Sequence, residues 1–159
     1  MIISSRSGDT GETSIGNGAK VSKDDPIMCL IGAIDECQAH AGAARVLSNG
    51  KTYENILYIE RELGLLMGHI AHCEGCECPL IEPLEEVIAQ AESKVENFIF
   101  LLPGESQLSA ALHIARTITR RAERLSVALF KEGRIGSDVL RYLNRLSDYF
   151  YALILLLED

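Results

Sequence analysis

The chain has 159 residues, of which 47% are hydrophobic, and a net charge of −8. This length fits one domain with a sizeable core, and the acidic balance argues against nucleic acid as a partner, because phosphate backbones require clustered Lys and Arg. The sequence has no apolar run of about 18 residues and no apolar signal core at its N-terminus, so we expect no membrane segment and a cytoplasmic protein. The five cysteines fit a reducing compartment.

Five segments are predicted to be helical, because they are rich in apolar residues, most of them at helical spacing. They span residues 28–47, 53–71, 79–95, 104–131 and 138–157. Pro79 opens the third segment, and Ser137 can cap the fifth. Strand signals are weak. The sequence therefore predicts an all-α fold of one domain over residues 1–159, with a helical bundle over 26–159 and an N-terminal arm over 1–25.

The N-terminal arm contains the stretch SRSGDTGETSIGNGAKVSKDD, Ser5 to Asp25, which has many glycines and hydroxyls and almost no large apolar side chain. Such a composition is typical of a disordered tail. The glycines at positions 8 and 11 also allow backbone N–H groups to turn toward an anion, with Lys23 adding positive charge. Both interpretations, a tail and an anion-binding loop, are open from the residues alone.

The stretch LHIARTITRRAER, residues 112–124, combines an apolar stripe with a charged face. On a helical wheel the apolar stripe contains Leu108, Ala111, Ala115, Ile118, Ala122 and Leu129. The opposite face contains His113, Arg116, Arg120, Glu123 and Arg124, with Arg121 just outside it. A solvated face is one interpretation. Arginines four residues apart repel one another, however, so an anionic ligand or an acidic partner is the other.

Three blocks of the sequence resemble the PduO-type ATP:cob(I)alamin adenosyltransferases, also called corrinoid adenosyltransferases. The first is the arm stretch continuing to GAIDE, the second is FLLPGESQLSAALHIARTITRRAER, and the third is LNRLSDYFYAL. The resemblance implies a five-helix bundle, expected to be a homotrimer with ATP bound between subunits. It also implies the reaction, in which cob(I)alamin attacks the 5′ carbon of ATP and releases triphosphate, giving adenosylcobalamin.

The resemblance also assigns roles to residues of the nucleotide site. Contacts to the ATP phosphates and ribose are expected from Ser5, Arg6, Ser7, Gly8, Thr13, Ser14 and Lys23. The fourth helix is expected to line the site with Arg120, Arg121, Glu123 and Arg124. Asn144 is expected near the phosphates and their Mg²⁺. Asp35 is expected to pair with Arg116 of a neighbouring subunit. An electron-donating reductase, and an adenosylcobalamin-dependent enzyme that takes the product, are the protein partners implied.

Phe100 is expected to press on the lower face of the corrinoid and exclude the lower axial ligand of cobalt. By its type alone, Phe100 would by default be expected in the core, because aromatic side chains chiefly serve burial. About 18 Å of helix separates Gly104 from Arg116 if the helix begins at Gly104, so we expect Phe100 and the arginines to lie far apart along one subunit. That separation favours a site between two subunits.

The chain departs from the family pattern before GAIDE. The family commonly has Arg, Glu and Tyr where this chain has Ile27, Cys29 and Ile31, and Asn where it has Gln38. These changes bear on corrinoid handling and subunit contact more than on ATP. An alternative function is therefore a non-catalytic carrier or sensor that binds ATP and a corrinoid on the same fold.

The stretch HIAHCEGCECP supports a different class of site. It groups His69, His72, Cys73, Cys76 and Cys78 between the second and third predicted helices. One Cys-x-x-Cys pair with nearby histidines can hold zinc or iron, although a structural zinc site usually has two such pairs. The other interpretation is a turn of small residues with reduced thiols.

Overall fold

The structure is a computed structural model that describes residues 6, 8–97 and 100–157. Within these ranges it contains five helices and one small hairpin, so the predicted all-α bundle is confirmed. The elements are β1 (Glu12–Ser14), β2 (Lys20–Ser22), α1 (Pro26–Val46), α2 (Gly50–Ile70), α3 (Glu82–Glu92), α4 (Gln107–Lys131) and α5 (Ser137–Leu155). None of the helices in these ranges combines the length and apolarity needed to cross a bilayer.

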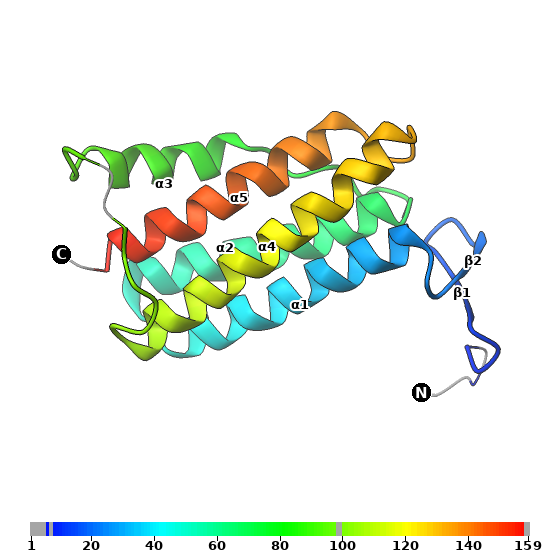
Figure 1. The fold of residues 1–159 in the computed structure, drawn as a ribbon, viewed down its shortest axis with the longest axis horizontal. Coiled ribbons are helices and arrows are strands. Elements are labelled where there is room, and N and C mark those ends of the chain that lie inside the picture. Colours follow the sequence, from blue (N-terminus) through cyan, green and yellow to red (C-terminus); the bar gives the residue numbers. More distant parts are fainter. Residues whose placement is uncertain (1–5, 7, 98–99, 158–159) are drawn as a thin grey trace.

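The four long helices lie side by side, and α4 is at the centre of the packing (Figure 1). Helix α4 contacts both α1 and α5, α2 packs on α1, and the shorter α3 packs on α5. The arm lies at the end of the bundle where α1 begins and α4 ends (Figure 1). Thus the arm and the C-terminal half of α4 are at the same end of the molecule.

The helices form the core through residues at helical spacing. On α5, Val139, Leu143, Leu146, Phe150 and Leu153 are buried and form a continuous apolar seam. On α4, the predicted stripe is confirmed at Ala115, Ile118, Ala122 and Leu129, whereas Leu108 and Ala111 are only partly buried. Apolar periodicity therefore specifies which faces of these helices pack together.

Each of the five helices begins one to three residues from its predicted start, and the beginnings of α3, α4 and α5 are the informative ones. Helix α3 begins at Glu82 rather than Pro79, with a proline in its first turn. Helix α4 begins at Gln107 rather than Gly104, because Ser106 and Ser109 form a reciprocal capping box. Ser137 is the first residue of α5 and not its cap, and the cap position is held by Gly136, without a side-chain hydrogen bond.

The arm contains a two-stranded antiparallel hairpin that the sequence analysis did not predict. Strand β1 pairs with β2 in the register Glu12 with Ser22 and Ser14 with Lys20. The turn closes through the Gly18 N–H to the Ile15 carbonyl, 2.8 Å, with Gly18 at φ +82°. Gly18 takes the left-handed position that follows the two central residues, Gly16 and Asn17, and this position favours glycine. The strands are three residues each, too short to show an alternating pattern.

Candidate functional site

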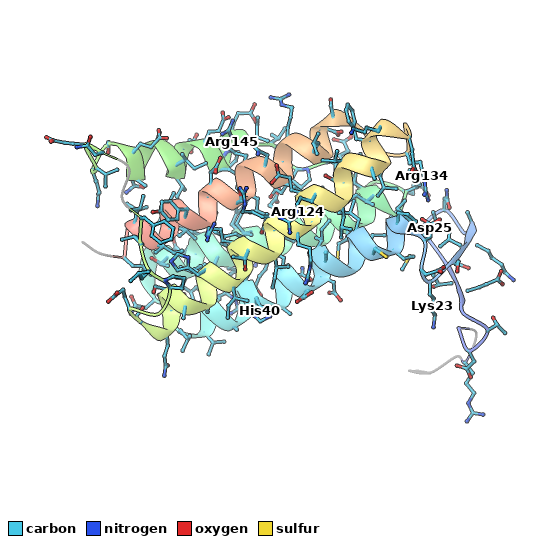
Figure 2. All side chains as sticks on the ribbon, viewed as in Figure 1. Lys23, Asp25, His40, Arg124, Arg134 and Arg145 are labelled. Atoms are coloured by element: carbon cyan, nitrogen blue, oxygen red, sulfur yellow. The ribbon has the colours of Figure 1, made fainter. Side chains whose placement is uncertain are left out.

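The loop before β1 gathers the glycines and the lysine that the sequence predicted to bind an anion. The Lys23 N–H donates to the Gly11 carbonyl at 2.8 Å, which closes the loop against β2. A Cβ added at Gly8 would lie 2.7 Å from Lys23 Nζ, so the ammonium group lies directly over the Gly8 backbone. Figure 2 shows Lys23 at this end of the molecule. The arrangement places a positive charge beside a loop whose backbone is accessible.

The remaining predicted arm residues are exposed, partly buried or outside the described ranges. Arg6 is exposed and has φ +56°, and Ser14 is exposed on β1. Thr13 is partly buried. Ser5 and Ser7 lie outside the described residues. Their contacts to a nucleotide thus stay a prediction.

An ion pair that the sequence analysis missed joins the arm to the bundle. Arg134, after the end of α4, places Nη2 2.6 Å from Asp25 Oδ1, and the same oxygen accepts the Ile27 N–H at 2.8 Å as the N-cap of α1. The Ile27 N–H and then the Arg134 guanidinium lower the pKa of Asp25 from its ordinary value. Figure 2 shows the two side chains meeting where the arm leaves the bundle. This contact fixes the direction of the arm relative to α4.

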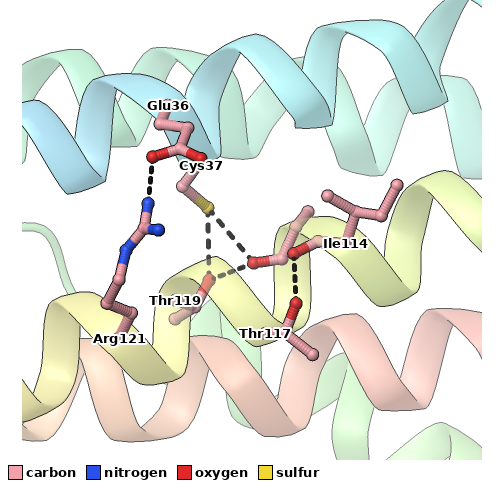
Figure 3. A network of polar contacts seen from close by, with 7 residues as sticks. Glu36, Cys37, Ile114, Thr117, Thr119 and Arg121 are labelled. Atoms are coloured by element: carbon pink, nitrogen blue, oxygen red, sulfur yellow. Dashed lines mark hydrogen bonds and ion pairs between the residues drawn. The ribbon is translucent and has the colours of Figure 1, made fainter.

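The arginines of α4 do not form one uniform face. Arg120 and Arg124 are exposed, and Arg124 lies midway along α4 in Figure 2. Arg121 instead forms an ion pair with Glu36 of α1 (Figure 3). In the same view Cys37 contacts the Thr119 hydroxyl at 3.2 Å, and burial raises the pKa of this thiol to about 12. Arg121 and its neighbours therefore join α1 to α4, and two arginines stay available to a ligand.

Glu123 and Asn144 lie together, one on α4 and one on α5. The Asn144 side-chain N–H donates to Glu123 Oε1 at 2.9 Å. This hydrogen bond leaves the amide oxygen of Asn144 and the second carboxylate oxygen of Glu123 for other partners. Oxygen ligands of this kind are those that Mg²⁺ prefers.

A hollow of about 540 Å³, here called the Phe100 hollow, opens between α3, α4, α5 and the segment before α4. Its polar and charged lining includes Glu92, Asn97, His113, Arg116, Arg120, Arg145 and Asp148. Its apolar lining includes Ile88, Phe100, Leu101, Pro103 and Leu155. Arg145 is held at one side by ion pairs with Glu85, 3.1 Å, and Asp148, 3.5 Å. The hollow thus combines apolar surface with charged groups of both signs, which suits a large ligand that has apolar and polar parts.

Phe100 lies on the surface of this hollow with 76% of its surface exposed, so the core interpretation of this residue is wrong. The predicted separation from the arginines is also wrong, because Phe100, Arg116 and Arg120 line the same hollow within one chain. The physical reason is the turn at Gly104, which has φ +113° and lies before α4 begins. The segment preceding α4 therefore lies beside the helix instead of extending its axis.

His113 was placed on the charged face by its wheel position, but only 4% of its surface is exposed. Neither ring nitrogen has a hydrogen-bond partner among the described residues. Burial, and then the charge of Arg116, lower the pKa of His113 from its ordinary value of 6.5. The wall of the Phe100 hollow thus holds a neutral imidazole that can still accept or donate a hydrogen bond.

Arg116 is partly buried beside His113. Its guanidinium carbon lies 6.0 Å from the centre of the Tyr151 ring, a cation–π distance. Its Nε has no hydrogen-bond partner among the described residues. Asp35, on α1, is exposed and forms no ion pair with Arg116 within the described part of the chain. The predicted pairing of these two residues therefore concerns a neighbouring subunit and stays a prediction.

The structure explains some of the residues in α1 that depart from the family pattern. Ile27 is buried in the core, and Ile31 packs against it, so both serve packing within the bundle. Gln38 donates its side-chain N–H to the Glu60 carbonyl of α2 at 2.6 Å. Cys29 is exposed, and the structure shows no packing reason for a thiol there.

Five packed helices, a glycine-rich arm and an arginine-bearing fourth helix define a helical bundle with a candidate anion-binding loop. The sequence profile of the cobalamin adenosyltransferase family matches residues 3–157. The chain belongs to this family, so the resemblance noted in the sequence is confirmed.

Two curated relatives and two solved structures support the assignment. The chain is 37% identical to a corrinoid adenosyltransferase of Bacillus subtilis, covering 96% of this chain and 84% of that protein. It is 34% identical to the corrinoid adenosyltransferase PduO of Salmonella typhimurium, covering 96% of this chain and 48% of that protein. A variant of the PduO-type enzyme from Lactobacillus reuteri complexed with ATP has a TM-score of 0.85 at 35% identity, covering 98% of this chain and 93% of that one. Another variant, complexed with cobalamin and ATP, has a TM-score of 0.85 at 35% identity, covering 96% and 89%.

Proposed function

We propose that the chain transfers the 5′-deoxyadenosyl group of ATP to cob(I)alamin, giving adenosylcobalamin and triphosphate. The cobalt electron pair forms the new cobalt–carbon bond, while the bond from C5′ to oxygen breaks and its electrons leave with the triphosphate. The observation that carries the proposal is the exposed Phe100 on a hollow shared with Arg116 and Arg120. A core phenylalanine would have no reason to lie there.

The ATP end of the site is assigned to the arm and to α4. Lys23 over Gly8, together with the exposed Arg120 and Arg124, supplies positive charge where the triphosphate is to lie. Charge-assisted contacts of this kind favour the transition state most, because the leaving triphosphate gains negative charge as its bond breaks. Arg121 is assigned a positioning role, since its ion pair with Glu36 holds α4 against α1.

The donor set of Glu123 and Asn144 fits a magnesium ion bound with ATP. Their hydrogen bond of 2.9 Å brings a carboxylate and an amide oxygen together on α4 and α5. Such an ion would neutralise phosphate charge when bound. The protein residues meanwhile orient the phosphates relative to the hollow.

The corrinoid is assigned to the Phe100 hollow. The apolar lining, including Phe100 and Leu101, suits the face of a large ring, and the phenyl group is placed to exclude a lower ligand from cobalt. The buried, neutral His113 lies in the wall behind this lining, and the exposed Arg120 offers hydrogen bonds to polar groups at the edge of the ring. Bringing two large reactants together in one orientation is the main contribution of the protein, since cobalt supplies the nucleophile.

We further propose a homotrimer in which Asp35 of one subunit pairs with Arg116 of the next. The exposed carboxylate of Asp35 and the partly buried guanidinium of Arg116 carry opposite charges, which supports this assignment. A cytoplasmic location, a reductase that delivers electrons to cobalt, and an adenosylcobalamin-dependent enzyme that receives the product complete the proposal.

An anaerobic assay with ATP and chemically reduced cobalamin tests the proposed reaction. We expect the spectrum of adenosylcobalamin to appear, with one triphosphate released for each cobalamin consumed. Binding of both compounds without that spectral change would instead support a carrier or sensor.

A further inference from the structure

Three residues from distant parts of the chain meet at the end of the bundle near the arm. They are His69 in the last turn of α2, Cys78 in the loop between α2 and α3, and Asp138 in the first turn of α5. One ligand atom of each, a ring nitrogen, the thiol sulfur and a carboxylate oxygen, lies within 4.8 Å of the other two. This group is separate from Lys23, Glu123 and the Phe100 hollow. The proposed reaction uses none of these three side chains.

The orientation of His69 is fixed by its second ring nitrogen. Nδ1 lies 3.3 Å from the carbonyl oxygen of Cys76, and Nε2 lies 3.6 Å from Asp138 Oδ2. When Nδ1 donates its hydrogen to that carbonyl, the lone pair of Nε2 faces the carboxylate. Metal-binding histidines are usually oriented in this way, by donation from the other ring nitrogen to a backbone carbonyl or a carboxylate. Three atoms that can each bind a metal ion then converge, and an ion between them would take the place of the thiol proton of Cys78.

A second hollow of about 420 Å³, the His69 hollow, adjoins this group. Its lining includes His69, His72, Arg134, Gly136 and Asp138. Arg134 forms an ion pair with Asp25 at 2.6 Å, so it does not serve as the counter-ion of the three ligand residues. The hollow gives a hydrated ion a path to two of the three ligands, His69 and Asp138.

We propose that His69, Cys78 and Asp138 bind a divalent ion of the zinc class, with water as the fourth ligand. Nitrogen, sulfur and oxygen donors in one site select Zn²⁺ or a similar borderline ion over Mg²⁺ or Ca²⁺. Tetrahedral bonds of about 2.0–2.3 Å place ligand atoms somewhat more than 3 Å apart. The separation of 3.6 Å between His69 Nε2 and Asp138 Oδ2 is close to this spacing, and all three ligand atoms lie within 4.8 Å of one another.

The ligand set differs from the one that the sequence suggested. His72 is exposed with φ +59°, and it is not in the group. Cys76 takes part through its carbonyl, which orients His69. Cys73 packs against the arm, since a Cβ added at Gly16 would lie 2.2 Å from its sulfur. The third ligand comes instead from α5, sixty residues further along the chain.

The site would link the end of α2, the α2–α3 loop and the start of α5. Because Cys73 belongs to the same turn and contacts Gly16, the linked region is also the surface on which the arm hairpin rests. An ion that binds the folded chain but not the unfolded chain stabilises the folded state by mass action. We therefore expect metal to raise the melting temperature.

Cobalt titration of the untagged, chelator-treated full chain tests the proposal. We expect one equivalent of Co²⁺ to bind with a near-ultraviolet sulfur-to-cobalt band, and Zn²⁺ to displace it. Cys78→Ser should remove the band, and His69→Ala and Asp138→Asn should weaken Zn²⁺ binding at least about tenfold. The matched controls Cys29→Ser and Cys76→Ser should keep both the band and the affinity.

Three results would overturn the proposal. They are failure to bind one equivalent, survival of the band in Cys78→Ser, and dependence of the band on Cys73 or Cys76 instead. If Cys78→Ser does not fold, Asp138→Asn decides the question, because about half of this side chain is exposed and its amide replacement fits the same space. Unchanged Zn²⁺ affinity in that variant would remove Asp138 from the site.

Discussion

The arm and the Phe100 hollow, the two regions assigned to the two substrates, are built in opposite ways. None of residues 6 and 8–24 is buried, and the arm holds its shape through a short hairpin and the contact of Asp25 with Arg134. The hollow instead lies among packed helices and includes the buried His113. Changes in the arm should therefore affect nucleotide binding with little effect on stability. Substitutions in the hollow should have two kinds of effect. Those on its surface should weaken ligand binding, and those in its wall should change stability.

Removal of residues 1–22 should produce the largest effect. The deletion keeps Lys23, the Asp25 cap and its ion pair with Arg134, so we expect the bundle to fold with a melting temperature near that of the full chain. ATP binding should fall below detection in calorimetry, because the loop that faces the phosphates is lost. Full ATP affinity in the truncated chain would show that the arm is only a tail.

Arg120→Ala should have the next largest effect. The side chain is exposed and lines the Phe100 hollow, so its loss should leave folding unchanged. Loss of one charge-assisted contact costs about 1.5–3 kcal/mol, which corresponds to roughly a tenfold to hundredfold weaker ATP affinity. Arg61→Ala, an exposed arginine on α2, is the matched control. Equal ATP affinities for the two variants would remove Arg120 from the nucleotide site.

His113→Leu should have a smaller effect, seen in stability and its pH dependence. The pKa of His113 is lowered in the folded state, so the unfolded chain binds the proton more readily. The part of the free energy of unfolding that depends on keeping His113 neutral is thus fully present above the unfolded pKa of about 6.5. It is lost as the pH falls below that value. Leucine removes an unpaired buried polar group, so we expect about 1 kcal/mol of stabilisation in urea at about pH 7.5 and more at about pH 5.5. Parallel pH profiles for the variant and the wild type would contradict the assignment.

The two regions also differ in how far the sequence predicts them. The seam of α5 and the stripe of α4 follow from spacing alone, because each helix buries one face. The hairpin around Asn17 and Gly18 has a turn signal in the sequence, but its strands are too short to show an alternating pattern. The position of Phe100 depends on a turn at Gly104, and the meeting of Asp138 with His69 depends on how α5 packs. Local spacing cannot encode such long-range contacts.

The most direct test of the central claim is the behaviour of Phe100→Ala from two starting states of cobalt. Because the side chain is 76% exposed, its removal should change the melting temperature little, as should the control Phe130→Ala at the other end of α4. We expect Phe100→Ala to keep most of the wild-type rate with pre-formed cob(I)alamin. It should fail with cob(II)alamin and a weak reductant, because the lower ligand is no longer excluded. Equal losses from both states, with a large fall in melting temperature, would return Phe100 to a structural role and contradict the account.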